Sequence, residues 1–256
     1  MQCKKNFVKP SKKDVYASFG IAYNGKQIDA PLFGWINPLL INGNAKLGKG
    51  VFTWSMTPGT VDQGGTCLCN CPGCYAKSGC YNFPSTKKSL AQKTVLARLY
   101  MDFVKRAIIA QIHAEKIQFV RIHAAGDFFN AAYIATWVEI VKACPGCTFW
   151  TYTKNPDAEN AFNGLDNANI VKSCIAGIGI NYGHCGYVMD AYNALTGAGE
   201  SVCICRCGVD DMQHCNNCKG CSSHKYVLFI EHSTAYKAQL DPIYPAICEI
   251  VNSQAQ

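Results

Sequence analysis

The first chemically distinctive segment of the chain is a run of cysteines spaced as metal ligands are. Cys67, Cys71 and Cys74 follow the pattern C-x3-C-x2-C. Three thiolates on such a loop can hold three irons of a 4Fe–4S cluster, which leaves the fourth iron open to a small chelating molecule. Cys69 or Cys80 can replace one member of this trio, and four thiolates suit a structural zinc ion equally well. The ligand types favour iron over zinc.

A second cysteine group, late in the chain, repeats the C-x2-C-x2-C spacing of ferredoxin-like cluster loops. Its predicted ligands are Cys207, Cys215, Cys218 and Cys221. Cys203 or Cys205 is an alternative to Cys207 as the fourth ligand, because alternate residues of an extended segment share one face. The group predicts either a second iron–sulfur cluster or a zinc site, unless both cysteine segments supply one shared centre.

The composition indicates a globular protein of a reducing compartment. Hydrophobic residues make up 49% of the 256 residues and charged residues 16%, which suffices for a substantial core. The N-terminus lacks the apolar centre of a signal peptide, and no later stretch is long and apolar enough to cross a membrane. We therefore expect a cytoplasmic location and no membrane partner. In that compartment, clustering among the 17 cysteines indicates metal rather than disulfides.

Alternating strand and helix patterns predict a parallel α/β fold. The strand patterns lie at 51–56, 118–123, 148–153, 170–180 and 226–230, and the helical patterns at 89–115, 130–143 and 157–163. We predict an incomplete (β/α) barrel-like parallel sheet with a Cys-rich metal-binding insertion. Its units are N-terminal strands and turns at 1–50, a βα core at 51–180, the insertion at 181–225, and a final strand with the C-terminal segment at 226–256.

Three polar features follow the ends of successive predicted strands. The first cysteine group follows one strand, Gly126 and Asp127 follow the next, and Lys154 ends the third. Because parallel strands present their carboxyl ends at one edge, these features are expected to share a rim. Gly126, Asp127 and Lys154 are therefore predicted to bind a cofactor, and His123 is a minor candidate. The alternative role for Asp127 is the N-cap of the helix near residue 130.

Two smaller signals have competing explanations. Cys144 and Cys147 have the spacing of a redox pair, but they also fit a turn between a helix and a strand. The net charge of +7 leaves nucleic-acid binding open, although no dense Arg/Lys stripe lies near the cysteines.

The cysteine loop after a strand, followed by residues 124–127 (Ala-Ala-Gly-Asp), resembles the radical S-adenosylmethionine superfamily. A closer resemblance is to the phage gene product 88 family. It rests on residues 74–77 (Cys-Tyr-Ala-Lys), 123–128 (His-Ala-Ala-Gly-Asp-Phe), 152–154 (Tyr-Thr-Lys) and the cysteines between 203 and 221. The resemblance covers about residues 50–225 and implies a viral protein of the host cytoplasm, without implying a reaction.

Three functions follow from these observations. The leading hypothesis is a viral 4Fe–4S protein related to the radical enzymes, with S-adenosylmethionine as the small-molecule ligand at the open iron. The second is a non-catalytic iron–sulfur protein that binds host proteins or senses redox state. The third is a zinc-stabilised nucleic-acid-binding protein.

Overall fold

The computed structural model describes residues 9–43, 47–69, 71, 74–175, 179–180, 182–183, 185–205, 220–230 and 242–253. Its centre is a five-stranded sheet with the order β3-β4-β5-β6-β7. These strands are β3 (Ile41–Asn42), β4 (Val51–Trp54), β5 (Phe119–Ile122), β6 (Thr148–Thr153) and β7 (Ala168–Lys172). The pair β3–β4 is antiparallel, and the strands from β4 to β7 run parallel to one another. The prediction of an α/β fold with a mostly parallel sheet is therefore confirmed.

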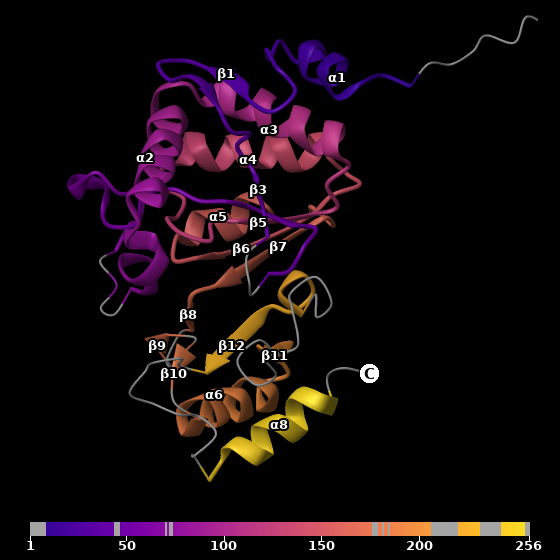
Figure 1. Ribbon diagram of the computed structural model, residues 1–256. Coiled ribbons are helices and arrows are strands. Elements are labelled where there is room, and N and C mark those ends of the chain that lie inside the picture. The colour runs from indigo at the N-terminus through magenta and orange to yellow at the C-terminus, as the bar shows by residue number, and fades with distance from the viewer. Residues whose placement is uncertain are drawn as a thin grey trace, which may run out of the picture.

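Helices pack on one face of this sheet (Figure 1). They are α2 (Pro84–Leu99), α3 (Met101–Glu115), α4 (Ala131–Ala143) and α5 (Pro156–Ala161). Their apolar sides join Phe52, Val120, Ile122 and Phe149 from the strands in the main core. The predicted single helix at 89–115 is wrong, because the chain breaks at Tyr100, whose φ and ψ of −135° and 47° end α2 before α3 begins.

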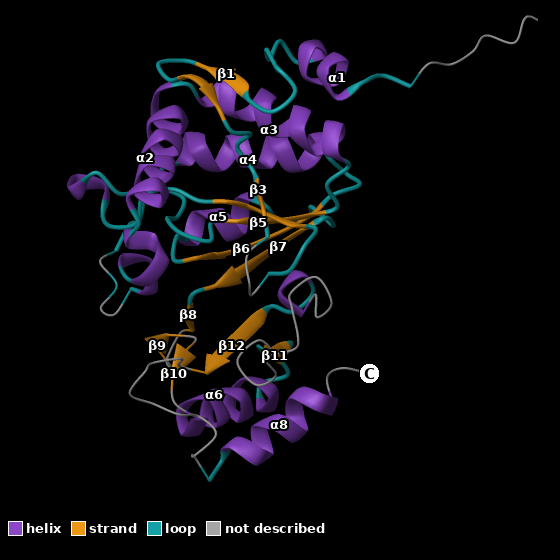
Figure 2. Cartoon of the chain, in the orientation of Figure 1, coloured by secondary structure: helices purple, strands orange, loops and turns teal. Residues whose placement is uncertain are grey.

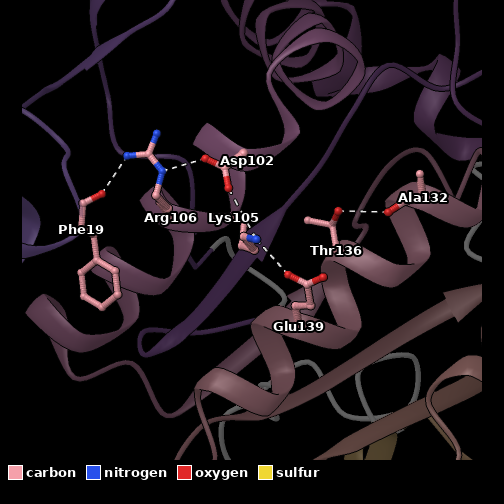
Figure 3. Close-up of polar contacts among 7 residues, drawn as sticks. All are labelled: Phe19, Asp102, Lys105, Arg106, Ala132, Thr136 and Glu139. Atoms are coloured by element: carbon pink, nitrogen blue, oxygen red, sulfur yellow. Dashed lines mark hydrogen bonds and ion pairs between the residues drawn. The ribbon is translucent and has the colours of Figure 1, made fainter.

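The N-terminal segment extends the helical layer with α1 (Lys12–Ser18) and the hairpin of β1 (Ile28–Ala30) and β2 (Gly34–Ile36). The prediction for this region lacked the helix, which a Ser11–Asp14 capping box begins. Figure 3 shows how α3 is fastened to its neighbours. Arg106 donates to the Phe19 carbonyl at 2.8 Å, and Lys105 pairs with Glu139 of α4 at 2.8 Å.

A smaller group of elements follows the five-stranded sheet, at the bottom of Figure 2. It contains β8 (Cys174–Ile175), β9 (Gly179–Ile180), β10 (Tyr182–Gly183), α6 (Cys185–Gly197), β11 (Val202–Ile204), the short 3-10 helix η5 (Gly220–Ser222), β12 (Tyr226–Ile230) and α8 (Tyr244–Ser253). The strands β10, β12 and β11 form a parallel sheet with its own core.

The described part of the predicted Cys-rich insertion, residues 181–225, contains a helix and a strand that the sequence patterns did not predict, α6 and β11. Val188, Ala191 and Leu195 bury one side of α6 against β11 and β12. The predicted strand at 170–180 ends at Lys172, and β8 and β9 are separate short strands. Within the described ranges, no helix has the length and apolar character needed to span a bilayer.

Candidate metal and ligand site

The first cysteine loop leaves β4 at the carboxyl edge of the parallel strands. Backbone hydrogen bonds join this exit to the exit of β5: Ala124 N donates to Trp54 O at 3.1 Å, and Met56 N donates to Ala125 O at 2.9 Å. Farther along, Cys67 N donates to Gly59 O at 2.8 Å, which closes the loop on itself. The prediction that the strand ends share one rim is therefore confirmed for these two exits.

Gly126 brings the exit of β5 into direct contact with the cysteine loop. Its φ is +82°, and a Cβ placed there would lie 2.5 Å from Thr66 Oγ1. Thr66 is fully buried and precedes Cys67, and its hydroxyl donates to Thr57 O at 3.0 Å. Only glycine combines this backbone conformation with so close an approach. Gly126 therefore positions the loop that carries Cys67.

Asp127 joins the exits of β5 and β6. Its Oδ1 accepts from Phe128 N at 2.7 Å and from the Thr153 hydroxyl at 2.5 Å, and its Oδ2 accepts from Lys154 N at 2.9 Å. Burial raises the pKa of this carboxyl, and the three hydrogen bonds act against that rise. Lys154 at the end of β6 therefore lies at the predicted rim, and it contacts Asp127 through its backbone amide.

The alternative prediction that Asp127 caps the helix is wrong. The N-cap of α4 is Asn130, whose side chain accepts from Tyr133 N at 2.8 Å. Asp and Asn are both good N-cap residues, so residue type alone does not identify the cap. The cap is the residue that is extended directly before the helix, and here that residue is Asn130.

The thiols of the first cysteine loop lie near one another. Burial, and after it the neighbouring acidic groups of Asp127, Cys71 and Cys74, raise the pKa of Cys67 to about 11. Cys69 Sγ lies 3.8 Å from Cys71 Sγ. Even so, no three Cys, His, Asp or Glu side chains of the described ranges are arranged as a metal site. The donor set itself fits iron or zinc, because closely spaced thiols that repel one another when ionised are stabilised by a cation.

The second face of the five-stranded sheet, opposite the helices, carries a polar group beside this loop. Arg121 of β5 lies over the ring of Tyr152 of β6, with 5.1 Å between the guanidinium carbon and the ring centroid. Tyr75 and Tyr81, which follow the cysteine loop, both donate to Ala124 O, at 2.6 and 3.2 Å. Neither Arg121 nor Tyr152 was among the predicted site residues. Alternation along β5 was the signal that could have placed Arg121 on this face.

The late cysteine group is described only in part. Cys207, Cys215 and Cys218 lie outside the described residues. Cys221 and Cys205 pack with Val171 and Tyr152 on the second face of the sheet. The segment around Cys221 is held there by Asn169, whose amide donates to Cys221 O and His224 O at 2.8 Å each. Of the late cysteines, Cys205 and Cys221 thus lie against the same sheet from which the first cysteine loop extends.

Cys144 and Cys147 fit the turn interpretation rather than a redox pair. Both are buried in the main core, where Cys147 N donates to Cys144 O at 3.0 Å. Burial raises the pKa of Cys144 to about 12, so very little of the reactive thiolate exists at neutral pH.

His123 directly follows β5 and lies on the helical side of the sheet in an unusual backbone conformation. Its φ is +61°, its side chain is 2% exposed, and its Nε2 lies 2.9 Å from the Tyr133 hydroxyl. That hydroxyl also accepts from Trp54 Nε1 at 2.7 Å, so it links His123 to the buried indole. Burial and then the charge of Arg121 lower the pKa of His123 to about 3. His123 is therefore a neutral core residue near the rim.

This depressed pKa predicts an acid-dependent loss of stability. In the unfolded chain His123 becomes protonated below about pH 6.5, whereas in the folded protein it stays neutral down to about pH 3. The free energy of unfolding should be flat above pH 6.5 and fall below it by up to about 1.4 kcal/mol per pH unit. Urea unfolding from about pH 4.5 to 7.5 measures this slope. His123→Asn, which tolerates a positive φ, should have a smaller slope, and equal slopes would contradict the assignment.

Comparisons with known proteins agree with this arrangement of motifs. A family model described as Gene product 88 matches residues 38–204, which include β4 to β7, the first cysteine loop and the Gly126–Asp127 turn. The Gene 88 proteins of Mycobacterium phages L5 and D29 are each 36% identical to the chain over 61 residues. Each match spans 24% of this chain and 24% of the relative, so about a quarter of the relatives' length is covered. No solved structure matches the chain. With its matched region extending over well more than half of its length, the chain belongs to the gene product 88 family.

Proposed function

We propose that this chain is a phage iron–sulfur protein that binds a 4Fe–4S cluster through Cys67, Cys71 and Cys74. The observation that carries the proposal is the position of this loop at the carboxyl edge of the parallel strands. There Gly126 and Thr66 hold it against the exit of β5, and the thiols of Cys71 and Cys74 lie within electrostatic reach of Cys67. Functional sites of open parallel sheets lie at this edge.

The residues around the loop define what the site can do. A bound 4Fe–4S cluster would supply one-electron transfer. Three protein thiolates would leave one iron for a small molecule, and we propose S-adenosylmethionine as that molecule. Asp127 and Lys154 border the loop and keep the strand exits together, and Gly126 allows close backbone approach. We retain the incomplete barrel as part of this proposal, with the second face of the sheet as its inner side.

A closed four-thiolate site is the second candidate. It is favoured by Cys69, whose Sγ lies 3.8 Å from Cys71 Sγ. Four protein thiolates would hold either zinc or a fully ligated cluster, and neither leaves an open iron. The function would then be non-catalytic: binding of a host protein, redox sensing or, with zinc, binding of nucleic acid.

Metal analysis of anaerobically purified protein tests the proposal. One cluster requires about four irons and four sulfides per chain, and a second cluster at the late cysteine group doubles both numbers. Zinc without sulfide would overturn the iron proposal, while zinc together with one cluster would assign zinc to the late group. Electron paramagnetic resonance of the reduced protein then tests S-adenosylmethionine, which should change the spectrum and yield deoxyadenosine.

Single substitutions identify the ligands. Cys71→Ser and Cys74→Ser should each lose most of the iron, whereas Cys248→Ser, in α8 and far along the chain, should keep it. Cys69→Ser separates the two candidates: the open site keeps its iron and its response to S-adenosylmethionine, and the closed site loses metal. Retention of full iron by Cys71→Ser and Cys74→Ser would show that the cluster is elsewhere.

A further inference from the structure

Arg121 is placed on the second face of the sheet by the alternation of β5. Val120 and Ile122 point into the helical core, whereas Phe119 packs with Trp150 and Tyr152 on the other side. Arg121 shares the side of Phe119, because alternate residues of a strand face the same way. Its guanidinium lies over the Tyr152 ring at 5.1 Å. A cation–π contact of this kind uses none of the N–H donors, so the guanidinium can still donate hydrogen bonds to other partners.

No anion of the described residues neutralises this cation. The largest electrostatic interactions of Arg121 that raise its pKa are with Tyr75, Tyr152, Cys221 and Tyr81. Hydroxyl and thiol groups of this kind are ordinarily neutral at pH 7. None of the ion pairs formed within the described ranges includes Arg121.

Two buried polar atoms at this position also lack nitrogen or oxygen partners. Arg121 Nε and the Tyr152 hydroxyl are each inaccessible to solvent and lack a nitrogen or oxygen hydrogen-bond partner within the part of the chain that the structure describes, where the Cys221 thiol is a polar neighbour of the Tyr152 hydroxyl. A half-buried charge without a counter-ion and two buried polar atoms without such partners cost stability unless a ligand completes them. Both atoms belong to neighbouring strands, since Arg121 is in register with Trp150, two residues before Tyr152.

We infer that Arg121 and Tyr152 form a binding site for a small anion, a carboxylate or a phosphate group. The guanidinium offers charge and in-plane donors to two oxygens, and the Tyr152 hydroxyl offers one more donor. The loop of Tyr75 and Tyr81 and the segment of Cys221 border the site. The site goes beyond the proposed cluster, because it uses no cysteine ligand and requires no metal.

Ligand-induced stabilisation tests this site with inorganic phosphate and with acetate as separate probes. Each is titrated against the full-length protein, with sodium chloride at matched ionic strength as the reference. Saturable stabilisation by one probe and not by the other identifies the preferred group. Arg121→Gln should weaken binding by at least about tenfold, and Arg121→Lys should retain part of it. Lys142→Gln, an exposed cation of α4, is the matched control and should bind as the parent does.

Tyr152→Phe keeps the ring beneath the guanidinium and removes only the hydroxyl. It should weaken binding by several-fold, and it decides the question if Arg121→Gln does not fold. Stabilisation that follows ionic strength alone, or that persists unchanged in Arg121→Gln or Tyr152→Phe, would overturn the inference. Cys71→Ser should bind the anion normally, so loss of the cluster and loss of the anion site can be told apart.

Discussion

Replacing Gly126 by alanine should lower the free energy of unfolding by about 3 kcal/mol. Two effects add at this position. The backbone has φ +82°, which penalises any side chain, and the new Cβ would lie 2.5 Å from Thr66 Oγ1 and 3.2 Å from Met56 Cβ. Because Thr66 adjoins Cys67, the strain is transmitted to the first cysteine loop. Urea unfolding measures the loss of stability, and iron content measures the effect on the loop.

Gly164→Ala is the matched control for this substitution. Its φ is +80°, but nothing lies within 4 Å of the added Cβ, so it tests the backbone penalty alone. It should cost about 1 kcal/mol and leave the iron content unchanged. If the two variants lose equal stability, close packing between Gly126 and Thr66 has no part in positioning the loop.

Replacing Asp127 by alanine should have an effect of similar size, about 3 kcal/mol, for a different reason. The carboxylate is the acceptor for the amides of Phe128 and Lys154 and for the Thr153 hydroxyl. Its loss would leave two buried donors and the part-buried Lys154 amide without their acceptor at the junction of β5 and β6. Denaturant unfolding at pH 7 provides the measurement.

Two further variants define the cause. Asp127→Asn keeps the size of the side chain, but its NH2 group would point at one of the donors that the carboxylate accepts from. It should lower the free energy of unfolding by about 2 kcal/mol, less than Asp127→Ala does. Asp166→Ala removes an exposed carboxylate and should change stability by less than about 0.5 kcal/mol. Equal stability of Asp127→Ala and the parent would mean that these hydrogen bonds do not hold the rim together.

The sequence was sufficient to predict the rim because its signals are local and repeated. The strand patterns at 148–153 and 226–230 coincide with β6 and β12, and the pattern at 118–123 contains β5. Once the strands are parallel, the residues that follow them must meet at one edge. The first cysteine loop, the Gly126–Asp127 turn and Lys154 therefore came together as predicted, although Lys154 takes part through its amide.

The parts that were missed depend on contacts between distant residues. The approach of Gly126 to Thr66 is set by tertiary packing, and no local pattern contains it. Helix α6 was not predicted, because its segment is rich in glycine, asparagine and cysteine, although Val188, Ala191 and Leu195 have helical spacing. The break between α2 and α3 at Tyr100 was not predicted, because apolar residues continue at helical spacing on both sides of it.

The register of the parallel strands has a kinetic consequence. Pairing Ile122 with Trp54 of β4 closes a loop more than twice as long as pairing Ile122 with Thr151 of β6. The shorter closure costs less chain entropy, so β5, α4 and β6 are expected to form the folding nucleus, with β4 added afterwards. Contacts that β4 and its cysteine loop make with the β5 exit would then be absent from the transition state. Strain introduced at Gly126 should consequently accelerate unfolding and leave the refolding rate nearly unchanged.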